Sequence, residues 1–113
     1  MAEVAISAPP LGVYNWRTPF RLDGVSGSLL WAWNTAGVRT FSGFVPCWTL
    51  YVYDSAGEIL AGPIPVAAAS SDLWGSWHYL DIPPGRLLCR SDENIPGRDA
   101  FQDGAALVYE TVG

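Results

Sequence analysis

The sequence predicts an all-β domain, a small sandwich or partly open barrel of six to eight short strands. Short stretches of alternating bulky, β-branched and aromatic residues recur along the chain at intervals of about ten residues. Clusters of Gly, Pro, Asp, Asn and Ser separate these stretches, as turns separate strands. No segment sustains the apolar period of about 3.6 residues that marks an amphipathic helix.

A chain of 113 residues, half of them hydrophobic, is one domain by length and can hold a core without metals or disulfides. Residues 1–12 show no clear apolar period and contain Pro9-Pro10, so we expect an extended N-terminal arm. Residues 13–113 are expected to form the β domain.

In the first half of the domain, bulky residues alternate between turn residues. They predict a strand over 13–23, a turn over 24–27, a strand over 28–34, a turn over 35–37 and an extended segment over 38–41. Pro19 places the first strand at an edge, because proline cannot donate to a ladder. Gly43 and Pro46 indicate a bend before the next strand.

A β-hairpin is expected in the middle of the chain. Residues 47–53 alternate in bulk, and 54–57 then interrupt them with turn chemistry. Gly57 is expected to take the left-handed conformation required by a type I turn with a G1 bulge. The return strand is expected over 58–66, although Pro63 and Pro65 place its second half at an edge or outside the sheet.

The second half predicts shorter elements. These are a loop over 67–71, a strand over 74–80, a turn over 83–85, a short strand over 86–90, a long loop over 91–104 and a closing strand over 105–112.

Charge and composition exclude several classes of function. The six basic residues are all Arg, they are scattered among eleven acids, and the net charge is −5. We therefore expect no binding to nucleic acid, which requires a positive stripe. No apolar run approaches the ~18 residues of a membrane segment, and the first ten residues do not resemble a secretion signal. We expect the protein to remain in the compartment where it is made.

Two cysteines, Cys47 and Cys89, are interpreted as small buried hydrophobes, with a disulfide as the less favoured alternative. His78 lies near Ser76 and Asp81, but a catalytic triad normally gathers its members from separate elements. We therefore expect a structural or surface histidine.

The remaining titratable groups do not indicate a catalytic, cofactor or metal site. The acids of 91–104 lack the alternating spacing of a calcium loop, and one histidine with two distant cysteines does not make a zinc site.

Six tryptophans are more than a core of this size usually needs, so we expect some of them at the surface. Exposed Trp, Tyr and Arg dominate binding energy at protein interfaces. Exposed aromatic rings also stack on sugars, which leaves a carbohydrate-binding role open.

Several motifs between the first predicted strands and the C-terminus form a further pattern. They are Leu29-Leu30-Trp31-Ala32-Trp33-Asn34, Trp48-Thr49-Leu50-Tyr51-Val52-Tyr53-Asp54, Gly57, Gly62-Pro63-Ile64-Pro65-Val66, Asp72-Leu73, Gly85-Arg86-Leu87 and Leu107-Val108-Tyr109. In these motifs the chain resembles the small baseplate plug proteins of tailed bacteriophages, over about three quarters of its length. Residues 41–46 and 74–84 depart from the pattern.

This resemblance implies a non-enzymatic structural component of a phage tail baseplate, made in the host bacterial cytoplasm and located in the virion. It would plug or join the hub, spike and tube region, and contact other tail and baseplate proteins as well as copies of itself in a symmetric ring. Besides the arm and the 91–104 loop, the expected interface residues are Pro63, Ile64, Pro65, Trp74, Trp77, Tyr79 and Arg98.

Two other classes of function remain open. A carbohydrate-binding or adhesin-type β domain of a virion is the alternative. A small hydrolase is a third possibility, and it rests on His78 and its neighbours alone.

Overall fold

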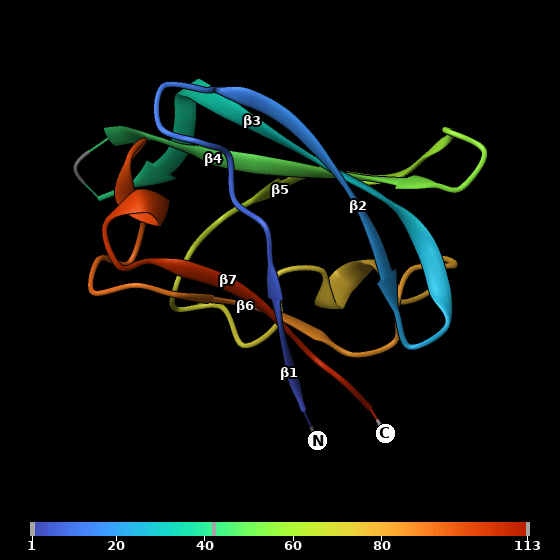
Figure 1. The fold of residues 1–113 in the computed structure, drawn as a ribbon. Helices are drawn as coiled ribbons and strands as arrows, with labels where there is room; N and C mark the ends of the chain where they lie inside the picture. The colour runs from blue at the N-terminus through green and yellow to red at the C-terminus, as the bar shows by residue number, and fades with distance from the viewer. Residues whose placement is uncertain (1, 42, 113) are drawn as a thin grey trace.

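The computed structural model describes residues 2–41 and 43–112, and it confirms the all-β class. Two antiparallel sheets pack face to face (Figure 1). The three-stranded sheet has the order β1-β7-β6 and the four-stranded sheet the order β2-β3-β4-β5. The strands are β1 (Glu3–Ile6), β2 (Asn15–Leu22), β3 (Val25–Thr40), β4 (Gly43–Asp54), β5 (Ile59–Pro65), β6 (Arg86–Arg90) and β7 (Ala106–Glu110).

The first hairpin, β2–β3, turns in two residues. Asp23 and Gly24 both have positive φ, 49° and 81°, as a type I′ turn requires, and Leu22 pairs with Val25. The turn predicted over 24–27 is therefore shorter, and residues 25–27 already belong to β3. β2 is an edge strand, as Pro19 predicted.

The second hairpin, β3–β4, corrects the expectation of uniformly short strands. The turn predicted over 35–37 is a bulge inside β3, where the pairing register with β4 shifts. Gly37 has φ +71° there, and a Cβ on it would lie 1.8 Å from the carbonyl oxygen of Val45. The chain reverses between Thr40 and Gly43, where a bend had been expected.

The third hairpin, β4–β5, confirms the predicted central hairpin. Gly57 has φ +87°, and the Asp54 carboxylate accepts hydrogen bonds of 2.9 Å from the backbone N–H groups of Ala56 and Glu58. β5 is the other edge of the four-stranded sheet, so Pro63 and Pro65 lie at an edge.

The N-terminal segment is extended as expected, but it is not separate from the β domain. Residues Glu3–Ile6 pair with β7, and the pairing continues where the N–H of Thr111 donates to the carbonyl of Ala2 at 2.8 Å. Pro9 is buried. The boundary predicted at residue 13 is therefore wrong, because backbone pairing on the edge of β7 holds the segment in the sheet. Met1 and Gly113 lie outside the described residues.

The segment over 74–80 is not a strand. It contains the short 3-10 helix η1 (Gly75–Trp77), and consecutive turns close it through Trp77 N–H to Trp74 C=O and Leu80 N–H to Trp77 C=O. The alternation of bulky residues gave the wrong prediction because hydrogen bonds to Asp72, described below, determine the local backbone. β6 matches its predicted bounds, and η2 (Ala100–Gln102) interrupts the predicted 91–104 loop.

Indole rings dominate the core between the sheets. Trp31 contacts Trp48 edge to face at a centroid distance of 5.8 Å and Phe101 at 4.9 Å. Trp74 packs in the same manner on Tyr109 at 5.9 Å. Edge-to-face pairs of this kind add stabilisation beyond the apolar area that they bury.

Cys47 and Cys89 are both buried and free, as the favoured interpretation predicted. Burial raises the pKa of the Cys89 thiol to about 11. It therefore packs as a neutral, small hydrophobe.

The hydroxyl group of Tyr109 links the β2–β3 turn to the segment that precedes β6. That hydroxyl donates to Asp23 at 2.5 Å and accepts from the N–H of Gly85 at 2.7 Å. Burial, together with the hydrogen bond to Asp23, raises the pKa of Tyr109 to about 12. The phenol thus remains a donor to the carboxylate of the β2–β3 turn.

Candidate functional site

The interface residues predicted on β5 face in opposite directions. Pro63 and Pro65 are exposed at the sheet edge, whereas Ile64 is 2% exposed and belongs to the core. The prediction for Ile64 is therefore wrong, because side chains alternate between the two faces of a strand.

The residues predicted around η1 differ in the same way. Trp74 is 1% exposed, and its indole N–H donates to the carbonyl of Gly85 at 2.9 Å, so it is a core residue and not an interface residue. Trp77 is half-buried against the core. Tyr79 is 78% exposed, so its ring is accessible to a partner.

Arg98 holds the 91–104 loop against the sandwich while its side chain stays at the surface. Its guanidinium lies over the ring of Tyr14, with 4.7 Å between Cζ and the ring centroid. Its carbonyl accepts a hydrogen bond of 3.1 Å from the indole of Trp48. The exposed members of the predicted set therefore lie on three different elements.

The tip of the β3–β4 hairpin carries the most exposed large hydrophobic residue of the described chain, and sequence reasoning missed it. Phe41 is entirely exposed and Phe44 is 68% exposed. The signal available in the sequence is the pair of phenylalanines on either side of Gly43, a residue from which only a bend was inferred. We call these two residues the hairpin-tip surface.

A groove of about 640 Å³ begins at this tip. Its walls come from β3 and from two loops, and its lining residues are Val38, Arg39, Thr40, Phe41, Ala67, Asn94 and Ile95. Most of these side chains are apolar or uncharged. The groove extends the hairpin-tip surface toward the loop that follows β6.

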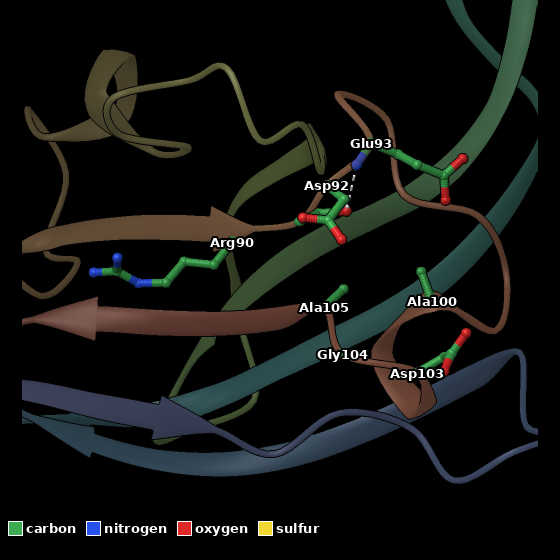
Figure 2. Close-up of a pocket in the computed structure, with 8 residues that line it drawn as sticks. Arg90, Asp92, Glu93, Ala100, Asp103, Gly104 and Ala105 are labelled. Atoms are coloured by element: carbon green, nitrogen blue, oxygen red, sulfur yellow. Dashed lines mark hydrogen bonds between the residues drawn. The ribbon is translucent and has the colours of Figure 1, made fainter.

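An acidic hollow of about 400 Å³ lies beside η2 and the end of β6. Figure 2 shows Asp92 and Glu93 together near its rim and Asp103 apart from them. Arg90 extends away from these carboxylates, and it pairs with Glu3 of β1. Nothing in the described part of the chain gathers three His, Cys, Asp or Glu groups as a metal site would.

His78 pairs with a residue that the sequence did not indicate. Its Nε2 lies 2.8 Å from Oδ2 of Asp72, whereas Asp81 and Ser76 are exposed. Asp72 and His78 are brought together by the turns around η1.

All six tryptophans lie in the described part of the chain, and each is buried or half-buried. Trp16, Trp33 and Trp77 reach the surface in part, as expected, but no tryptophan is fully exposed. The exposed aromatic residues are Phe41, Phe44, Tyr14 and Tyr79.

Comparisons with known proteins add no relative. No family model, curated protein or solved structure matches this chain. In residues 2–41 and 43–112, no helix has the length and apolar character needed to cross a membrane.

Proposed function

We propose that this protein is a non-enzymatic structural component of a bacteriophage tail baseplate, where it joins the hub, spike and tube region. The resemblance of its packing and turn motifs to baseplate plug proteins supports the proposal. The exposed hairpin tip is the structural observation that carries it.

The hairpin-tip surface has the properties of an anchor for another subunit. Burying one Phe side chain contributes about 1.5–3 kcal/mol; in the isolated chain Phe41 gains none of this and Phe44, at 68% exposed, gains only the smaller part. Large apolar side chains that cluster at the surface beside a groove mark interaction sites in soluble domains. The groove between 38–41 and 94–95 offers room for side chains of the same partner.

The edge strand β5 provides a second contact region. Pro63 and Pro65 are exposed there, and neither can donate to an added strand. Contacts at this edge therefore use side chains rather than a continued backbone ladder. Tyr79 and Arg98 contribute further surface residues of the types that are enriched at interfaces.

The inward tryptophans give the carbohydrate-binding alternative less support than the baseplate proposal. Sugar rings stack on flat exposed aromatic faces, and the indoles of this chain pack between or against the sheets. No observation specifically favours that alternative.

A comparison of tail particles tests the proposal. The double variant Phe41→Ser/Phe44→Ser should reduce the amount of this protein in purified tails at least tenfold, because it removes the anchor. Ile59→Ser is the control, since Ile59 is also exposed, at 55%, but it begins β5, where it pairs with Tyr53 far from the tip and at the opposite end of β5 from Pro63 and Pro65.

Protein content is measured by quantitative mass spectrometry of purified particles. The proposal requires normal incorporation of the Ile59→Ser control. Equal amounts of the wild-type and tip-variant proteins in tails would show that the tip is not the anchor. Absence of the wild-type protein from tails would overturn the baseplate assignment itself.

A further inference from the structure

The carboxylate of Asp72 organises the chain around η1. Its Oδ1 accepts hydrogen bonds from the N–H groups of Trp74 at 3.3 Å and Leu87 at 3.0 Å, and its Oδ2 lies 2.8 Å from Nε2 of His78. An ionised carboxylate has no proton to donate, so the proton in the third contact belongs to Nε2 of His78.

In the neutral form of the ring, this contact favours the tautomer of His78 that carries its proton on Nε2. When Nε2 carries the proton of the neutral ring, Nδ1 holds a free lone pair and is an acceptor. Among the described residues, Nδ1 has no hydrogen-bond partner. The imidazole is thus oriented by a half-buried acid, and in its neutral form it keeps Nδ1 as an acceptor.

His78 lies in the wall of a cleft of about 590 Å³ between the β2–β3 turn and the segment after η1. The lining residues are Gly24, Val25, His78, Leu80, Asp81, Ile82 and Pro84. The ionisable side chains among them are His78 and Asp81, and Asp81 is exposed with no described partner. Aliphatic side chains form most of the remaining wall.

We propose that this cleft binds the ammonium group of an alkyl chain, as the lysine side chain of a partner protein presents it. An ammonium has three donors and no acceptor, which complements a neutral imidazole nitrogen and a carboxylate. The aliphatic stem of lysine packs along apolar side chains while its charged end remains hydrated. An anion would be opposed by Asp81 and by the net charge of −5.

We expect the lysine that occupies the cleft to belong to a protein other than this one. The 113 residues contain no lysine, so they do not offer this side chain to a second copy. The inference goes beyond the proposed role of the hairpin tip and does not depend on it. Binding is measured on the purified protein alone, so its failure would leave tail incorporation untouched.

The test is a ¹H–¹⁵N NMR titration of the full chain at pH 7.5 with n-butylammonium chloride. n-Butanol serves as the uncharged probe. We expect saturable shifts at the amides of residues 24–25 and 80–82 and at Nδ1 of the His78 ring. A Kd of about 1–10 mM is expected for so small a ligand. Equal binding of n-butanol, or shifts confined to other surfaces, would overturn the proposal.

Two variants of equal charge separate the cleft from general electrostatics. Asp81→Asn should weaken butylammonium binding at least fivefold, because it removes the exposed carboxylate in the cleft. Asp99→Asn removes one exposed carboxylate outside the cleft and should leave Kd unchanged. Similar losses in both variants would indicate attraction by net charge alone and reject the site.

A second pair of ligands identifies the source of the ammonium. Nα-acetyl-lysine-N-methylamide carries the side chain on a peptide backbone, whereas spermidine is a free polyamine. Tighter binding of the lysine derivative supports a protein partner. Tighter binding of spermidine would overturn the assignment to lysine.

Discussion

The two ends of β4 are opposite in character. At its C-terminal end, the turn from Asp54 to Glu58 is closed by backbone hydrogen bonds within the turn and by backbone N–H groups that donate to the Asp54 carboxylate. At its N-terminal end, the hairpin tip leaves Phe41 entirely exposed and Phe44 68% exposed. The turn at the C-terminal end thus stabilises the fold through its hydrogen bonds, whereas the tip at the N-terminal end carries exposed side chains that contribute little to folding. The proposed contact with another subunit would account for the second end, whereas the stability of the isolated domain does not require it.

The largest expected effect comes from the bulge that supports the hairpin tip. Gly37→Ala should destabilise the domain by about 3 kcal/mol, because the new Cβ meets the Val45 carbonyl in a backbone conformation unfavourable to L-residues. Urea unfolding followed by Trp fluorescence measures the change. A variant with unchanged stability would show that the bulge relaxes freely and does not hold the tip in place.

The next effect concerns the hydrogen-bonded turn. Asp54→Ala removes the acceptor of two backbone N–H groups and should cost about 1–2 kcal/mol. Asp54→Asn keeps a side-chain oxygen and is the matched control, with a smaller loss. If both variants lose the same stability, the charge of Asp54 matters and its acceptor geometry does not.

A smaller effect is expected at Gly57. Its Cβ would meet no atom within 4 Å, so Gly57→Ala should cost about 1 kcal/mol through the positive φ alone. Gly97→Ala is the control, since Gly97 has open space and lacks a positive φ. Equal denaturation midpoints for the two variants would argue against strain in the turn.

The smallest effect on stability is expected at the hairpin tip. Phe41→Ser/Phe44→Ser should change the free energy of unfolding by less than about 0.5 kcal/mol, because both rings are exposed. Thermal unfolding followed by circular dichroism measures this. A loss of 2 kcal/mol would mean that the rings contribute to folding and would remove the contrast between the two ends of β4.

Local chemistry in the sequence was sufficient to predict the fold class and several elements. Asp54 and Gly57 specify their turn within five residues, and 86–90 has the composition of a strand. The hydrogen bond from Leu87 N–H to Asp72 joins residues 15 apart, and no local pattern contains it. The same acid accounts for the failure to predict the turns near Trp74.

The candidate sites were less predictable than the fold. Residue type alone suggested Trp74 as an interface residue, but only packing against Tyr109 shows that its ring is internal. The exposure of Phe41 depends on where the chain reverses, which in turn depends on the bulge at Gly37. The position of His78 beside Asp72 follows from η1, whose sequence alternates like a strand.

The pairing of β1 with β7 also places the two ends of the described chain side by side (Figure 1). The N–H of Ala2 donates to Oγ1 of Thr111 at 3.0 Å, and the N–H of Thr111 donates back to Ala2. A linker of a few residues would therefore join the ends at little entropic cost. Opening the circle at Leu11-Gly12, in the exposed stretch between β1 and β2, would yield a circular permutant with the same sheets and a free hairpin tip.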